Sequence, residues 1–149
     1  MASISVFSDE YFMKQAYQQA RIAAEEGEVP VGAVVVMDNR IIARTYNQVE
    51  RLKDVTAHAE ILAITAAAEH IGNKYLWDCT LYVTLEPCLM CAGALSWAQL
   101  GKLVFAAQDD KRGYMKCGKD ILHPGTKLAY GVMNEECSQL IRSFFAKLR

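Results

Sequence analysis

The stretch Thr80–Cys91, which reads TLYVTLEPCLMC, combines a strand signal, a helix start and a pair of thiols. Its first six residues are rich in β-branched and aromatic side chains, which favours a buried strand. Pro87 suits the first turn of a following helix, which we expect over residues 88–98. Cys88 and Cys91 are three residues apart, so both sulfurs should lie on one face of that helix.

A second short string, His58-Ala59-Glu60, supplies an imidazole and a carboxylate. It lies near the start of another predicted helix, from about Ala57 to His70. A structural zinc site is normally closed by four protein ligands, whereas a catalytic site keeps one position for water. We therefore interpret His58, Cys88 and Cys91 as the ligands of a catalytic zinc ion, one per chain. Glu60 is then placed to carry the proton of the activated water.

Both strings fall at predicted helix N-termini, where the partial positive charge lowers the pKa of a thiol. We expect adjacent parallel strands to bring the two helix starts to one metal. Two other interpretations of the cysteines stay open. A PCxxC string also occurs in redox pairs and in halves of zinc ribbons, although a ribbon needs a second CxxC. A non-enzymatic zinc module would need a fourth protein ligand, such as Cys79 or Cys117.

The composition indicates one globular domain, residues 1–149, with 52% hydrophobic and 22% charged residues. The first fifteen residues carry Asp9 and Glu10, so we expect no signal peptide. The longest apolar stretch, Val31 to Met37, is too short to span a bilayer. Five cysteines, two of them in a PCxxC string, argue for metal ligation in a reducing compartment rather than for disulfides. The expected location is the cytoplasm, with no membrane partner.

The net charge of −1 hides an asymmetry along the chain. Residues 1–99 hold 7 Lys or Arg and 12 Asp or Glu, whereas residues 100–149 hold 9 and 5. The basic final third can meet a phosphate backbone, or it can simply be a solvated surface.

The remaining segments predict an α/β domain with helices on both faces of a mixed sheet. Ser8 and Asn134 are the expected N-caps of the first and last helices. A long loop over residues 108–126 is expected to be functional or disordered. The other expected elements are a helix over 9–26, strands over 31–37, 41–46, 102–107 and 127–132, and a helix ending near residue 147.

Longer stretches of the chain resemble the zinc-dependent nucleoside and nucleobase deaminases, whose signature is H-x-E…P-C-x-x-C. Within this group the chain looks most like the bacterial tRNA adenosine deaminases, over nearly its whole length. The stretches that carry the resemblance are Glu28–Ala33 (EVPVGA), Thr56–Ile61 (TAHAEI) and Leu81–Ala94 (LYVTLEPCLMCAGA).

The resemblance implies a three-layer α/β/α, cytidine-deaminase-like fold around a five-stranded mixed sheet. It implies zinc-dependent hydrolytic conversion of adenosine to inosine at the wobble position of a tRNA anticodon. The partners would be a tRNA anticodon stem-loop and a second copy of the chain in a homodimer. The alternative within the same superfamily is a small-molecule deaminase that acts on guanine, cytosine or a nucleotide.

The resemblance also implies substrate contacts. The amide of Asn47 would pair with the purine edge, and Asp109 would lie in the loop that contacts the flipped nucleotide. Without the resemblance, Asn47 is better explained as a strand-end turn residue and Asp109 as an ordinary acidic loop residue. The base-pocket walls and the RNA-facing cations would be Val29, Leu85, Lys111 and Arg112.

Two residues depart from the family pattern. Trp97, followed by Ala98, resembles guanine deaminases of the same superfamily, which keeps the small-molecule alternative open. Tyr114 in the long loop either stacks on a base or fills a gap in the packing.

Overall fold

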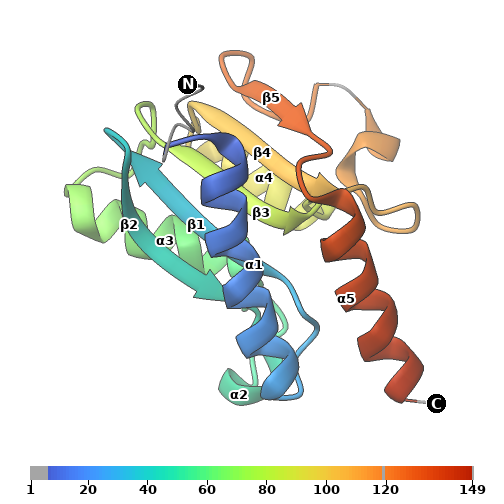
Figure 1. The fold of residues 1–149 in the computed structure, drawn as a ribbon. Helices are drawn as coiled ribbons and strands as arrows, with labels where there is room; N and C mark the ends of the chain where they lie inside the picture. Colours follow the sequence, from blue (N-terminus) through green and yellow to red (C-terminus); the bar gives the residue numbers. More distant parts are fainter. Residues whose placement is uncertain (1–6, 119, 149) are drawn as a thin grey trace, which may run out of the picture.

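Five strands form one mixed sheet in the order β2-β1-β3-β4-β5 (Figure 1). The computed structural model describes residues 7–118 and 120–148. β1 pairs antiparallel with both neighbours, and β3, β4 and β5 run parallel. The mixed sheet expected from the sequence is therefore confirmed. The strands are β1 Gly32–Met37, β2 Arg40–Tyr46, β3 Thr80–Leu85, β4 Lys102–Ala107 and β5 Lys127–Tyr130.

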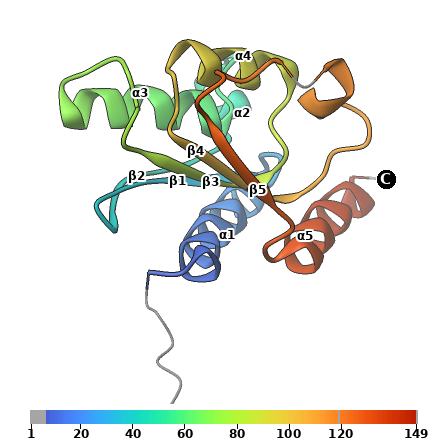
Figure 2. The same cartoon turned by 90° about the horizontal axis from the view of Figure 1, so that it is seen from above.

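Helices cover both faces of this sheet, as Figure 2 shows with the sheet seen on edge. α3 and α4 lie on one face, and α1 and α5 lie on the other. The three-layer α/β/α prediction is thus confirmed. The helices are α1 Asp9–Glu25, α2 Val49–Leu52, α3 Ala59–Ile71, α4 Leu89–Trp97 and α5 Asn134–Lys147, with a 3-10 turn, η1, over Tyr114–Cys117.

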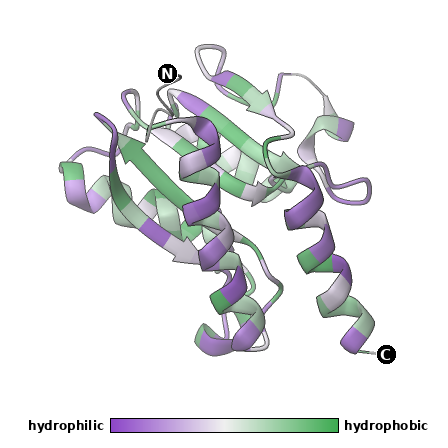
Figure 3. Cartoon of the chain, viewed as in Figure 1, coloured by the Kyte–Doolittle hydropathy of each residue, from purple (hydrophilic) through white to green (hydrophobic). Residues whose placement is uncertain are grey.

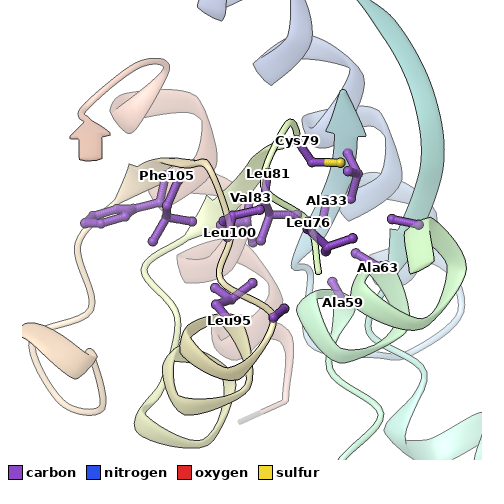
Figure 4. Packing of buried hydrophobic residues seen from close by; sticks show 14 of the residues in the cluster. Ala33, Ala59, Ala63, Leu76, Cys79, Leu81, Val83, Leu95, Leu100 and Phe105 are labelled. Atoms are coloured by element: carbon purple, nitrogen blue, oxygen red, sulfur yellow. The ribbon is translucent and has the colours of Figure 1, made fainter. Parts of the chain in front are cut away.

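The strand residues alternate between two hydrophobic cores because successive side chains point to opposite faces of a sheet. In β1, Ala33 and Val35 join the core under α3 and α4, whereas Val34 and Val36 join the core under α1 and α5. Both faces are covered, so the central strands are apolar along their length, while α1 and α5 alternate between polar and apolar residues (Figure 3). Figure 4 shows the first core, where Leu95 of α4 points toward strand residues such as Val83.

The loops that will form the site meet at one edge of the sheet. Gly32, at the start of β1, pairs with Tyr46 at the end of β2, and Leu85 pairs with Ala107 at the ends of β3 and β4. The amino end of β1 therefore lies beside the carboxyl ends of β2, β3 and β4. In α/β sheets this carboxyl edge is where ligands usually bind.

The sequence prediction about neighbouring strands was wrong. β2 and β3, which lead toward α3 and α4, run in the same direction, but β1 lies between them. The two helix starts converge although their strands are not adjacent.

Several element boundaries also differ from the sequence predictions. Ser8 does cap α1, since its Oγ accepts a hydrogen bond from the Tyr11 N–H. Asn134 is the first helical residue of α5 rather than its cap, and its Oδ1 accepts from Ser138 instead. The strand expected over 127–132 ends at Tyr130, and the expected long loop contains η1. No helix among the described residues has the length and apolar character needed to cross a bilayer.

Gly32 lets α1 pack closely against the sheet, so a larger residue at this position should lower the stability of the fold. A Cβ at this position would lie 2.2 Å from the Ala16 carbonyl oxygen and 2.3 Å from the Ala20 nitrogen, and both are backbone atoms. We predict that Gly32→Ala lowers the free energy of unfolding, measured in urea, by about 3 kcal/mol or more.

Gly72→Ala is the comparison variant. A Cβ there meets no atom within 4 Å, and only the left-handed φ of 71° is unfavourable, at about 1–2 kcal/mol. An equal or smaller loss in Gly32→Ala would contradict the packing argument.

Candidate active site

Three ligand atoms meet where α3 and α4 begin. His58 is the N-cap residue of α3, Cys88 is the N-cap residue of α4, and Cys91 lies one turn inside α4. The His58 Nδ1 lies 3.7 Å from the Cys88 sulfur and 3.4 Å from the Cys91 sulfur. All three atoms lie within 4.8 Å of one another. The structure thus brings together the three residues that the sequence analysis interpreted as metal ligands.

These distances fit a tetrahedral zinc ion. Zinc–sulfur bonds of about 2.3 Å and zinc–nitrogen bonds of about 2.0 Å place the nitrogen and a sulfur about 3.6 Å apart. The observed separations of 3.4 and 3.7 Å lie on either side of that value. Within residues 7–118 and 120–148, no fourth His, Cys, Asp or Glu joins the group. The donor set therefore suits a metal that keeps one position open.

The charges at this site are already arranged for ligation. Hydrogen bonds from Cys91 and His58 lower the pKa of the Cys88 thiol to about 4. The Cys91 thiol donates to Cys88, which raises its own pKa. The hydrogen bond between His58 and Cys88 raises the pKa of His58. One negative charge is thus shared between the two sulfurs beside an imidazole, and a bound cation would draw both thiols into the thiolate form.

Glu60 lies in the first turn of α3, and its side chain is buried. Burial raises the pKa of its carboxyl group to about 7. A carboxyl group in that range can both accept and return a proton near neutral pH.

The start of α3 is fixed by buried polar contacts. The Asn47 Oδ1 accepts a hydrogen bond of 2.7 Å from the Ala59 N–H, and the Thr45 hydroxyl donates to the Ala59 carbonyl at 2.8 Å. The start of α4 has an equivalent support, since the Tyr114 N–H donates to the Pro87 carbonyl and Cys88 forms a β-bridge with Gly113. Each metal-ligand segment is therefore held by residues from another part of the sheet edge.

A cavity of about 520 Å³ is lined by two of the three ligand residues, His58 and Cys88, and by Glu60. A larger groove of about 920 Å³ shares several wall residues with it and follows α5 and the loop after β4. The charged residues on its walls are three cations, Lys111, Arg112 and Arg142, and two acids, Asp109 and Asp110. Residues of the first cavity include Val29, Asn47, His58, Glu60, Leu85, Cys88, Asp109 and Arg112.

All six residues predicted to contact substrate lie on these walls. Asn47 lines the first cavity alone, Lys111 lines the groove alone, and Val29, Leu85 and Arg112 line both. The Asn47 Nδ2 has no hydrogen-bond partner among the described residues. Asp109 lies on both walls, but its Oδ1 accepts from the backbone N–H groups of Lys111 and Arg112. Its carboxylate therefore shapes the loop.

One alternative for the long loop was wrong. Tyr114 is buried in the core beneath α4, so it fills a gap in the packing and is not available to stack on a base. Trp97, at the end of α4, is 85% exposed and lines neither cavity.

The sequence analysis missed two buried glutamates and one wall of the cavity. Glu28 and Glu86 line the cavity and are 2% and 4% exposed. Glu86 directly follows β3 and Glu28 lies four residues before the start of β1, and no spacing rule assigned either residue a role. The wall formed by α5 comprises Phe144, Phe145 and Leu148.

The comparisons with known proteins agree with this geometry. The model of the MafB19-like deaminase family matches residues 7–149. The tRNA-specific adenosine deaminase of Aquifex aeolicus is 48% identical over 145 residues, which are 94% of this chain and 95% of the relative.

Solved structures of two kinds share the fold. One comes from a study of A-to-I editing by tRNA:A34 deaminases at the wobble position of transfer RNA. It superposes with a TM-score of 0.82 at 43% identity, covering 87% of this chain and 98% of the other. The second is the guanine deaminase of Nitrosomonas europaea, with a TM-score of 0.79 at 26% identity, covering 93% and 85%.

Sequence identity along almost the whole chain, a shared fold and the convergence of His58, Cys88 and Cys91 point the same way. The chain belongs to the family of tRNA-specific adenosine deaminases, within the cytidine deaminase-like superfamily.

Proposed function

We propose that this protein converts the wobble adenosine of a tRNA anticodon to inosine by hydrolysis, using one zinc ion per chain. The observation that carries the proposal is the group of His58, Cys88 and Cys91, whose residues His58 and Cys88 line one cavity together with the buried Glu60. The cavity volume of about 520 Å³ is in the usual range for sites that enclose a small organic group.

His58, Cys88 and Cys91 would hold the zinc ion. Zinc bound there would lower the pKa of a water ligand and so supply a nucleophile at neutral pH. Glu60 accepts a proton from the attacking water and delivers it to the ring nitrogen N1 of adenine. The water oxygen bonds to C6. The proton that remains on this oxygen passes through Glu60 to the exocyclic amine, the exocyclic C6–N bond breaks to release ammonia, and a C6 carbonyl remains.

The cavity walls orient the purine. Asn47 uses its Oδ1 for the backbone of α3, so its Nδ2 is left to donate to an acceptor on the base. Val29 and Leu85 contribute apolar surface to the wall that would contact the base. This arrangement fixes C6 of the ring relative to Glu60, which is the positioning that a bimolecular reaction needs.

The groove beside the cavity suits the RNA around the target nucleotide. Its three cations, Lys111, Arg112 and Arg142, outnumber its two acidic residues, Asp109 and Asp110, and Phe145 and Leu148 give it apolar surface. An anticodon loop presents unpaired bases, so turning one outward costs less than extracting a base from a duplex. We place the reaction in the cytoplasm, where reduced thiols remain available for metal binding.

The second candidate is a small-molecule deaminase, favoured by the similarity to a guanine deaminase at 26% identity. It shares the zinc chemistry but gives the cationic groove no purpose. The choice between the two candidates therefore rests on whether the cations contribute to turnover.

The protein acts as a homodimer in this proposal. The outward face of α4 carries three large apolar side chains, Leu89, Met90 and Trp97, which are 50%, 40% and 85% exposed. An apolar helix face of this kind usually marks a protein contact. Because Leu89 follows Cys88 directly, a second copy on this face would lie beside the cavity.

We predict that Glu60→Ala retains about one zinc ion per chain but lowers inosine formation by about 10³-fold or more, because the proton carrier is lost. Metal content by mass spectrometry and inosine by nucleoside analysis give the two readouts. Glu69→Ala is the matched control, since Glu69 is exposed on the same helix. Near-normal turnover by zinc-loaded Glu60→Ala would contradict the assigned role.

The substrate is tested with transcribed tRNA bearing a wobble adenosine, with guanine, adenine and cytidine assayed in parallel for ammonia release. We predict inosine at the wobble position and no turnover of the free compounds. Reversing Lys111 and Arg112 to Glu should raise KM for tRNA and flatten its salt dependence. Lys14→Glu with Arg21→Glu, an equal charge change at exposed positions of α1, is the control. Guanine turnover with inert tRNA would favour the small-molecule candidate.

The dimer is tested by sedimentation of the wild type and of Trp97→Glu. We predict a wild-type dimer and a folded monomeric variant, because a buried charge disrupts an apolar contact. Leu128→Glu places the same charge on the exposed side of β5 and should leave the dimer intact. A monomeric wild type, or a dimeric Trp97→Glu, would contradict the assigned face.

A further inference from the structure

We propose that Glu28 and Glu86 are a matched pair of positioning residues, each fixing one rim of the substrate cavity through two backbone N–H groups. Both carboxylates are buried, both line the cavity, and neither has a salt-bridge partner among the described residues. The consequences for catalysis rest on the proposed function, whereas the contacts themselves do not.

Glu86 holds the loop after β4. Its Oε1 accepts from the Asp109 N–H and its Oε2 accepts from the Met115 N–H, both at 3.0 Å. The two amides lie at opposite ends of the segment 109–115, so a single side chain closes that segment into a loop. Inside it, the Asp109 Oδ1 accepts from the N–H groups of Lys111 and Arg112 at 3.0 and 3.1 Å. The position of both cations therefore depends on Glu86.

The same loop reaches the metal-ligand segment. Gly113 forms a β-bridge with Cys88, and the Tyr114 N–H donates to the Pro87 carbonyl at 3.0 Å. A Cβ on Gly113 would lie 2.2 Å from the Glu86 Oε2 and 2.3 Å from its Cδ. The loop can approach Glu86 this closely only because residue 113 has no side chain.

Glu28 holds the opposite rim in the same way. Its Oε1 accepts from the Glu50 N–H at 3.0 Å and its Oε2 accepts from the Arg51 N–H at 2.9 Å. These amides belong to α2, whose N-cap residue, Gln48, makes no side-chain cap. The carboxylate from outside the helix thus satisfies N–H groups that a single helical turn leaves unpaired.

This second rim also reaches a metal-ligand segment. Asn47 lies just before α2, and its Oδ1 accepts from the Ala59 N–H next to His58. The Gln48 N–H donates to the Ala57 carbonyl at 3.0 Å. Each glutamate therefore orders a rim that carries a substrate contact on one side and supports a zinc ligand on the other.

The two glutamates should affect different kinetic constants. Arg112 is expected to bind the RNA backbone equally in the ground and transition states, so loosening its loop raises KM. Asn47 is expected to orient the base against the nucleophile, so loosening its rim lowers kcat. A purely structural role would instead lower stability without separating the two constants.

The test compares Glu86→Gln and Glu28→Gln, which keep the side-chain size but point an amide NH₂ at a backbone N–H. With an anticodon stem-loop as substrate, well below the melting temperature, kcat/KM should fall about tenfold to a hundredfold. The fall should lie mainly in KM for Glu86→Gln and mainly in kcat for Glu28→Gln, with zinc content unchanged. Tyr82→Phe is the matched control, since it loses a 2.7 Å bond to the Asp9 carboxylate away from the cavity.

Amide hydrogen exchange measures the protection of these backbone N–H groups independently of catalytic activity. Glu86→Gln should speed exchange at Asp109 and Met115 but not at Glu50 and Arg51, and Glu28→Gln should show the reverse. Gly113→Ala is a second variant that disturbs the Glu86 contact and should match Glu86→Gln in KM, in case the latter fails to fold.

Wild-type kcat and KM in the Gln variants, or an equal kinetic loss in Tyr82→Phe, would overturn the proposal, as would unchanged exchange at the named amides. A wild type that binds zinc but forms no inosine would overturn the proposed function instead, and the exchange pattern would then decide the role of the two glutamates.

Discussion

The meeting of the His58 imidazole with the two thiols of Cys88 and Cys91 is the constraint on which the rest of the structure depends. The three atoms lie within 4.8 Å of one another, yet they come from two helix starts that are thirty residues apart in the chain. Both helices must begin at the same edge of the sheet, and their strands must run in the same direction. The antiparallel β1 between those strands meets this requirement, because it places the starts of α3 and α4 side by side without adjacent parallel strands.

Holding two helix starts together exposes backbone groups that need partners, and the cavity is built from the side chains that supply them. Asn47 and Thr45 satisfy the backbone of Ala59, while Glu28 and Glu86 satisfy the loops at the two rims. A buried N–H without a partner costs about 1–3 kcal/mol, so these contacts stabilise the fold and shape the cavity together. The polar residues that surround the ligands are therefore part of the architecture and of the proposed chemistry.

The sequence predicted much of this, for physical reasons that differ between elements. The central strands β1, β3 and β4 were readable because their apolar runs are nearly continuous, and the ligands because His-x-Glu and PCxxC each lie within one turn. α2 was missed because a helix of four residues has no periodicity to detect.

The side-chain contacts of the loops could not be predicted from the sequence. Nothing in it indicated that the Asp109 Oδ1 would accept hydrogen bonds from its own loop, or that Glu86 would accept them from amides 23 and 29 residues away. Contacts of this kind depend on which loops meet at the sheet edge, and that is fixed only by strand order. Tyr114 was ambiguous between packing and stacking because burial is a property of the folded loop.

The most direct test of the central claim is zinc K-edge X-ray absorption on the purified protein. The account predicts a four-coordinate zinc ion with two sulfur neighbours at about 2.3 Å and two nitrogen or oxygen neighbours at about 2.0 Å, which are the two cysteines, His58 and one exchangeable water. A third or fourth sulfur neighbour, or a protein that binds no zinc when the metal is supplied, would contradict an open catalytic site.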